Sequence, residues 1–173
     1  MAEIRRLAPS WGGDGGRIIL VGHSAGAYIA AMLALDERWL GARDGVAGAV
    51  GIAGPYDFLP IQGADIRAVF AAAGADLPPT QPINHAAAGA PPLLLLHGAR
   101  DTTCYPRNSL VLAARVRAAG GAARAVLYPR VGHIGIVLGF VPWLARCPTR
   151  ADVVGFAADI LAGAPAAAIQ PAA

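Results

Sequence analysis

Four short apolar runs, separated by stretches with helical patterns, constrain the fold of this chain more than any other feature. None of the runs alternates with polar residues, so each is typical of a parallel strand buried on both faces. They are residues 17–21, 46–53, 93–96 and 125–128. Parallel strands need crossover connections, which are usually helical and right-handed. The order therefore predicts an α/β fold in which about four parallel strands lie between two layers of helices, a three-layer sandwich.

Helices are predicted at residues 25–35, 108–119 and 150–162, between and after the runs. The segment 55–90 is rich in Pro, Gly and Ala and holds one short predicted helix at about 65–73. We interpret this segment as a cap or lid insertion within a single domain that spans residues 1–173, a length typical of one domain.

Composition excludes several classes of protein. Hydrophobic residues make up 55% of the chain and charged residues only 14%, which indicates a globular core. The 14 basic residues are all arginine and are scattered, so a net charge of +3 predicts no nucleic-acid partner. No uninterrupted apolar stretch reaches the roughly 18 residues that span a bilayer. Cys104 and Cys147 match no redox or metal spacing, which favours free thiols and a cytoplasmic location.

A serine lies between two glycines at the first strand-to-helix junction. The sequence Gly22-His23-Ser24-Ala25-Gly26 follows run 17–21 and opens helix 25–35. This arrangement is the signature of a nucleophile elbow, a turn so tight that it presents the serine hydroxyl in open space. We expect side chains at positions 22 and 26 to collide with the neighbouring strand and helix, which would explain both glycines.

A serine needs a base to take its proton and a carboxylate to orient that base. Such partners are expected on loops at the carboxyl ends of later strands. Asp101 follows the third run, and His133 follows the fourth. The chain order Ser24, Asp101, His133 is the order of α/β-hydrolases and differs from the orders of chymotrypsin-like and subtilisin-like enzymes.

The chain resembles the α/β-hydrolases, and within them the esterase and lipase branch that includes arylformamidase-like carboxylesterases. The resemblance rests on Gly22 to Ala27, Ala53 to Asp57, His97-Gly98 with Asp101 and Pro106, and Gly132-His133, and it spans roughly residues 12–140. It implies ester hydrolysis through an acyl-enzyme, with Ser24 as nucleophile, His133 as general base and then acid, and Asp101 orienting His133. The backbone N–H of Ala25 would donate to the oxyanion. The substrate would be a small ester, and no cofactor or metal is implied.

The same resemblance implies parts that this chain lacks. Family members carry opening strands and a His-Gly-Gly-like loop upstream of the elbow, whereas only 23 residues precede Ser24. Run 17–21 is therefore expected to be an exposed edge through which the chain could self-associate. A catalytically inactive fragment or an interaction module remains an alternative function, and amidase or formamidase activity at the same site is another.

Two further residues are expected beside the site. Asp57 follows the second run and is expected to be a structural or substrate-side acid, with the triad acid as its less favoured role. His23 is expected to pack beside the elbow, shape it and contribute to substrate binding.

The other histidines have structural interpretations. His97 is expected to close the end of its strand, and His85 to be solvated or to face the substrate. A zinc site is disfavoured because its candidate ligands show no short spacing. Those candidates are His85, His97, His133 and Asp101.

Overall fold

The computed structural model describes residues 1–40 and 45–163. In these residues four parallel strands form one sheet in the order β1-β2-β3-β4, as the apolar runs predict. The strands are β1 Ile18–His23, β2 Val46–Ile52, β3 Leu93–Gly98 and β4 Ala123–Tyr128. Because all four run in the same direction, the residues that follow them gather at one edge of the sheet.

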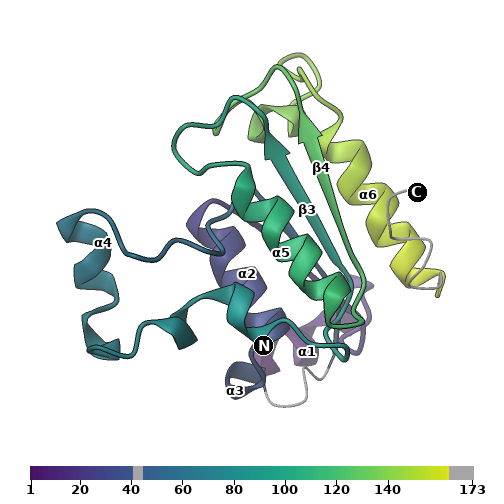
Figure 1. The fold of residues 1–173 in the computed structure, drawn as a ribbon. Coiled ribbons are helices and arrows are strands. Elements are labelled where there is room, and N and C mark those ends of the chain that lie inside the picture. Colours follow the sequence, from purple (N-terminus) through teal and green to yellow (C-terminus); the bar gives the residue numbers. More distant parts are fainter. Residues whose placement is uncertain (41–44, 164–173) are drawn as a thin grey trace.

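Helices cover both faces of the sheet (Figure 1). The helices α2 (Ala25–Leu35) and α5 (Arg107–Ala118) pack on one face, and α6 (Thr149–Leu161) packs on the other. All three lie within one residue of the ranges predicted from the sequence. Alanine, the strongest helix former, supplies five of the eleven residues of α2 and lets that helix approach the sheet closely. The three-layer α/β arrangement is thus confirmed.

The leucines of β3 divide the core into two halves. Leu93 and Leu95 face the layer of α2 and α5, whereas Leu94 and Leu96 face the layer of α6. All four are essentially inaccessible to solvent. Successive side chains of a strand point to opposite faces, so a run of four leucines is the pattern that a central strand buried on both faces requires.

Shorter helical segments complete the described chain. The α-helices are α1 Ala2–Leu7, α3 Glu37–Leu40 and α4 Ala64–Val69. The 3₁₀ segments are Ala8–Trp11, Ala71–Ala73, Pro78–Thr80, Pro82–His85 and Val137–Phe140. The helix expected at 65–73 is therefore shorter than expected and continues as a 3₁₀ turn.

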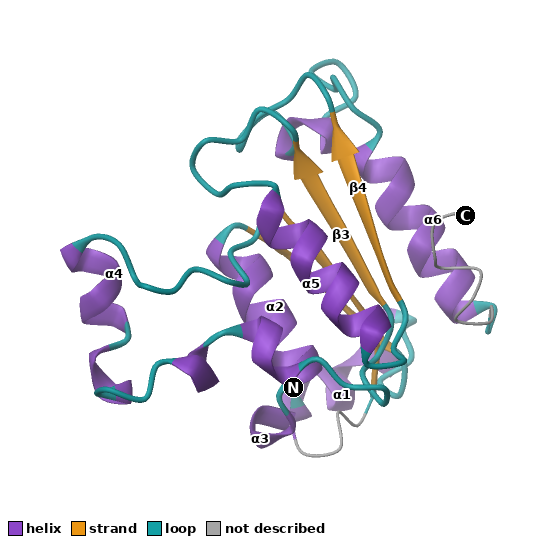
Figure 2. Ribbon diagram, viewed as in Figure 1, coloured by secondary structure: helices purple, strands orange, loops and turns teal. Residues whose placement is uncertain are grey.

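The insertion 55–90 has two parts that differ in how they meet the body (Figure 2). Its outer part carries α4 and projects beside the sheet, with Val69 76% exposed and Ile66 49% exposed. Its returning part packs against α2, and Gln81 there is buried. The oxygen Oε1 of Gln81 accepts a 2.9 Å hydrogen bond from the Phe58 N–H, which joins the two ends of the insertion.

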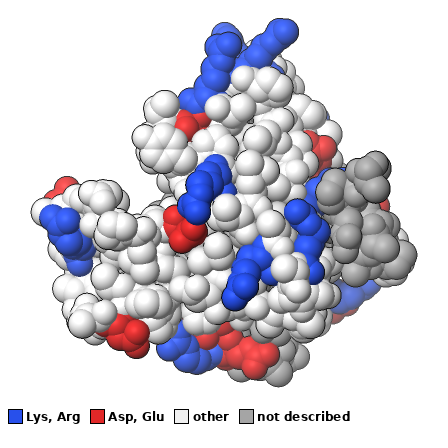
Figure 3. Space-filling model, viewed as in Figure 1, with Lys and Arg blue, Asp and Glu red and all other residues white. Residues whose placement is uncertain are grey.

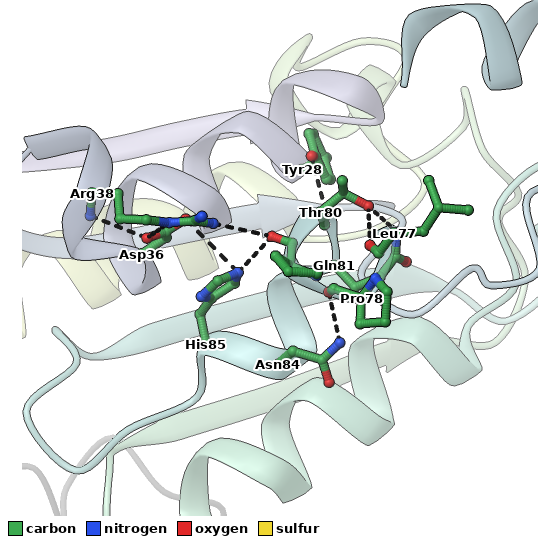
Figure 4. Close-up of polar contacts among 10 residues, drawn as sticks. Tyr28, Asp36, Arg38, Leu77, Pro78, Thr80, Gln81, Asn84 and His85 are labelled. Carbon is green, nitrogen blue, oxygen red and sulfur yellow. Dashed lines mark hydrogen bonds and ion pairs between the residues drawn. The ribbon is translucent and has the colours of Figure 1, made fainter. Parts of the chain in front are cut away.

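Polar contacts hold the returning part against α2 (Figure 4). The Tyr28 hydroxyl donates to the Thr80 carbonyl at 2.9 Å. The buried Asp36 carboxylate, at the end of α2, is paired with Arg38 at 2.7 Å, and Arg38 also donates to the Pro79 carbonyl at 3.4 Å. The hydrogen bonds from Arg38 hold the pKa of Asp36 below its usual value. The base of the insertion is therefore held by polar contacts, whereas its outer part meets α2 through the ring of Phe70, 5.8 Å from that of Tyr28.

Strand β1 lies at one edge of the sheet. Within the described residues it pairs only with β2, and its Val21 side chain is 50% exposed. The expected exposed edge is therefore present. No helix in the described part of the chain is long and apolar enough to cross a membrane.

Candidate active site

The turn between β1 and α2 has the geometry of an elbow. Ser24 has φ 55° and ψ −122°, a conformation that L residues rarely adopt. A Cβ at Gly22 would lie 2.7 Å from the Ala27 nitrogen and still closer to the Gly26 carbonyl oxygen, so only glycine fits there. The expectation for Gly26 is wrong: a Cβ at that position meets no described atom within 4 Å, because it points away from both elements.

Ser24, His133 and Asp101 form a continuous chain of hydrogen bonds. The Ser24 Oγ lies 2.9 Å from His133 Nε2, and His133 Nδ1 lies 2.7 Å from Asp101 Oδ2. The carboxylate accepts from Nδ1–H, which leaves Nε2 free to accept from the serine hydroxyl. The three residues follow β1, β3 and β4, and the parallel sheet brings those strand ends together.

Asp101 is buried, and both oxygens of its carboxylate accept hydrogen bonds. Its Oδ1 accepts the backbone N–H groups of Thr103 and Cys104, both at 2.9 Å. Burial raises the pKa of Asp101, but the hydrogen bonds from Cys104, His133 and Thr103 outweigh it and hold that pKa below its usual value. The carboxylate is therefore ionised and fixed in position, as a group that orients His133 must be.

His97, expected to close the end of its strand, braces the loop that carries Asp101. Its Nε2–H donates to the Cys104 carbonyl at 2.8 Å, so its Nδ1 accepts from the Ser109 hydroxyl, also at 2.8 Å. The same Nε2 lies 3.3 Å from Asp101 Oδ2. Burial lowers the pKa of His97, which keeps the ring neutral and suits it to these partners.

His23 supports the other loop. Its Nε2 donates to the His133 carbonyl at 3.0 Å, and the two rings lie 4.8 Å apart. Burial lowers the pKa of His23. A Cβ at Gly98 would lie 2.8 Å from the Val131 carbonyl carbon, so glycine there lets the loop bearing His133 pack against the end of β3. His23 therefore lies beside the turn at Ser24 and contacts His133, and its expected part in substrate binding stays a prediction.

His85 lies apart from this cluster. Its Nε2 donates to the Pro79 carbonyl at 2.8 Å and lies 3.8 Å from Asp36, in the contacts at the base of the insertion. Among the described residues no group of three or more His, Cys, Asp or Glu side chains is placed to hold a metal ion. The N–H of Ala25 belongs to the first turn of α2, where N–H groups have no acceptor within the helix and can face an oxyanion.

Asp57 lies at the carboxyl end of the neighbouring strand β2. Its carboxylate pairs with Arg107 of α5 at 3.0 Å, and its N–H donates at 2.9 Å to the Asn108 side chain, which also accepts the Tyr56 N–H. Asp57, Arg107 and Asn108 border a pocket of about 630 Å³. Asp57 is therefore paired with Arg107 beside a pocket, whereas the carboxylate that bonds to His133 is that of Asp101.

Sequence reasoning missed Asn108 and Ser109. Both belong to the first turn of α5, and they hold the loop after β2 and the ring of His97, respectively. Their contacts span 52 and 12 residues. The adjacent polar residues before the apolar stretch Leu110 to Ala114 were the signal that the sequence offered.

The comparisons with known proteins agree with this geometry. The profile of the prolyl oligopeptidase family matches residues 10–141. No curated protein sequence matches the chain significantly. Similar solved structures include an esterase from the planctomycete Thermogutta terrifontis with propionate bound, at 21% identity and a TM-score of 0.71 over 91% of this chain. A truncated carbohydrate esterase from gut microbiota matches at 18% identity and a TM-score of 0.72, also over 91%.

An acylaminoacyl peptidase bound to a peptide chloromethyl ketone is a more distant match, at 19% identity and a TM-score of 0.60 over 76% of this chain. The match covers 22% of that peptidase, whereas it covers 61% and 64% of the two esterases. This chain thus spans less than two thirds of the esterases that it matches. Together the matches confirm the α/β-hydrolase resemblance.

Proposed function

Because the chain belongs to the prolyl oligopeptidase family, we propose that it is a serine hydrolase that cleaves carboxylic esters through an acyl-enzyme. The observation that carries the proposal is the hydrogen-bonded chain from Ser24 through His133 to Asp101 at the carboxyl edge of the sheet. Its substrates would be small esters, and its chemistry needs only side chains and water.

The geometry supports a two-step reaction. His133 Nε2 takes the proton of Ser24 as Oγ attacks the ester carbonyl carbon, and the alkoxide leaves with that proton. Water then attacks the acyl-enzyme with His133 again as base, which releases the acid and restores Ser24. Asp101 stabilises the imidazolium in both steps, and the Ala25 N–H donates to the carbonyl oxygen as negative charge develops on it.

Labelling and kinetics together test this proposal. A fluorophosphonate probe should label Ser24, detected by mass spectrometry of the modified peptide, because only an activated serine reacts with it. Ser24→Ala should lower hydrolysis of a short-chain aryl ester by at least about 10³-fold. Ser10→Ala is the matched control, since Ser10 is exposed and bonds only to the Leu7 carbonyl. Equal rates for wild type and Ser24→Ala would reject the proposal.

Ester hydrolysis is favoured over amide hydrolysis by the two esterases among the structural matches, and the peptidase match makes amides the second candidate. Matched ester and anilide substrates with the same acyl group would separate them, with kcat/KM higher for the ester. Hydrolysis of a formanilide tests the alternative of formamidase activity directly.

Two free cysteines, Cys104 and Cys147, support a cytoplasmic location, where thiols stay reduced.

The exposed edge at β1 supports a second function as an interaction surface. Its unpaired backbone groups can accept a strand of another copy, so residues 17–21 would mediate self-association. Light scattering over a range of concentrations measures this. Val21→Lys should shift the protein toward monomer, because a charged edge side chain opposes strand addition. A wild-type protein that is monomeric at every concentration would exclude self-association through this edge.

A further inference from the structure

A pocket lies at the carboxyl edge of the sheet, beside the loop that follows β2, and its wall carries an exposed cation. The pocket holds about 630 Å³ between the loop after β2 and the loop after β3. In Figure 3 the surface is hollowed between the part of the chain that carries α4 and the rest of the molecule. Its lining combines apolar and polar side chains: Asp57, Phe58, Leu59, Pro60, Gln62, Tyr105, Pro106, Arg107 and Asn108.

Both sides of the pocket are linked through intervening residues to the catalytic residues proposed above. On one side Phe58 packs against Tyr28, with ring centroids 6.0 Å apart, and the Tyr28 N–H donates to the Ser24 carbonyl one helical turn away. On the other side, Tyr105 directly follows the loop that Asp101 organises. Ser24 follows β1 and Asp57 and Phe58 follow the neighbouring strand β2, so a substrate bound at Ser24 can extend along this edge of the sheet toward the pocket.

The more exposed of the two charged groups in the pocket lining is the cation. The Arg107 side chain is 68% exposed, whereas Asp57 is 29% exposed and holds Arg107 through one N–H only, Nη1 at 3.0 Å. The guanidinium keeps its remaining N–H groups for a further acceptor. A carboxylate on an apolar chain matches this surface, since the chain would contact Phe58 and Pro106 while the anion binds Arg107.

A second observation points to the same charge. Arg130 and Arg146, on loops beyond β4, line a smaller pocket of about 200 Å³, and neither pairs with an acidic side chain of the described chain. Figure 3 shows basic side chains projecting from the top of the molecule, where the carboxyl ends of β3 and β4 lie. This edge of the sheet therefore attracts anions toward the site, an effect that salt weakens.

From these contacts we infer that the pocket is a subsite for a carboxylate-bearing substrate, an ester whose acyl chain ends in an anion that Arg107 binds and Asp57 orients. The inference rests on the proposed function, which it narrows to acidic esters. The opposite assignment, in which Asp57 would bind a cationic group, is disfavoured because the Asp57 side chain is 29% exposed whereas the Arg107 side chain is 68% exposed.

Two aryl esters of equal chain length test the inference: 4-nitrophenyl valerate, which is neutral, and the 4-nitrophenyl monoester of glutaric acid, which ends in a carboxylate. Wild type should favour the anionic ester in kcat/KM, and Arg107→Gln should lower that preference about tenfold, the size of one charge-assisted hydrogen bond at an exposed site. Arg115→Gln, exposed on the same helix two turns further along, is the matched control and should leave the ratio unchanged. Asp57→Asn should keep or raise the ratio of kcat/KM for the anionic ester to kcat/KM for the neutral ester.

A binding measurement separates failure of this inference from failure of the proposed function. Monomethyl glutarate, detected by saturation-transfer NMR, should bind Ser24→Ala and should bind the Ser24→Ala, Arg107→Gln double variant far more weakly. Binding without any Ser24-dependent hydrolysis would reject the proposed function and retain the subsite. Ser24-dependent hydrolysis with the same ester preference in wild type and Arg107→Gln would overturn the inference. A preference for the anionic ester that is lost in Asp57→Asn and kept in Arg107→Gln would also overturn the inference.

Discussion

The two glycines of the elbow respond differently to the addition of one methyl group. In Gly22→Ala the new Cβ would lie 2.7 Å from the Ala27 nitrogen and closer still to the Gly26 carbonyl. These are backbone atoms, which cannot rotate away, so the turn itself must open. Overpacking costs about 1 to 3 kcal/mol or more, and a backbone clash lies at the upper end of that range. We expect a loss of about 3 kcal/mol in the free energy of unfolding.

Gly26→Ala meets no described atom and lies in the first turn of α2. Alanine is favoured over glycine in a helix by up to about 1 kcal/mol, and it also reduces the freedom of the unfolded chain. We expect this variant to be as stable as the wild type or up to about 1 kcal/mol more stable. The two substitutions, four residues apart in one motif, should therefore differ by about 3 to 4 kcal/mol.

Urea unfolding followed by far-UV circular dichroism measures this difference directly. The two variants carry the same chemical change, so effects common to glycine replacement largely cancel in the comparison. Equal losses in both variants, or a larger loss in Gly26→Ala, would refute the geometry of the turn. That outcome would restore the simpler expectation that both glycines are sterically required.

Three further predictions concern the polar contacts. His97→Leu removes two 2.8 Å hydrogen bonds and leaves the buried Ser109 hydroxyl and the Cys104 carbonyl without a partner. The free energy of unfolding should therefore fall by about 3 to 5 kcal/mol, measured by urea titration. Ser109→Ala should lower it by about 1 to 2 kcal/mol in the same titration. Burial lowers the pKa values of His97 and His23, so the unfolded state binds more protons, and stability should fall as pH drops below about 6.5. Thermal unfolding from about pH 7.5 to about pH 5.5 measures this, and a variant lacking both rings should show a weaker dependence of Tm on pH. An equal dependence of Tm on pH in the variant and the wild type would contradict this assignment. Tyr28→Phe keeps the ring contacts but loses the bond to the Thr80 carbonyl, and should cost about 1 kcal/mol by calorimetry.

The elements that could be predicted from the sequence are those with a strong local pattern. The apolar runs identified all four described strands, because a strand buried on both faces leaves an unbroken hydrophobic stretch. Ser24, Asp101 and His133 could be proposed as partners because each follows such a run, and parallel strand ends meet at one edge. Once the strand order is known, much of the arrangement follows from topology.

Contacts between distant polar groups could not be predicted in this way. Asn108 holds the backbone of a loop 52 residues away, and His97 bonds to Ser109 and Cys104 through its two ring nitrogens, yet neither pattern repeats along the chain. The direction of a side chain at Gly26 depends on the exact path of the turn, which the motif does not encode. The division of the insertion into a fixed base and a projecting part likewise depends on single hydrogen bonds such as that from Tyr28.

The position of β1 has a consequence for how the site loses order. Within the described residues Ser24 follows β1, a strand with one hydrogen-bonded neighbour, whereas Asp101 follows β3, which has two. Opening of β1 breaks one ladder and leaves the rest of the sheet intact, so its amide protons should exchange at a lower free energy than those of β3. Ser24 would then separate from His133 in a subglobal opening, and labelling of Ser24 by a fluorophosphonate, expected from the proposed function, would disappear at urea concentrations where the helices still give their full circular dichroism signal.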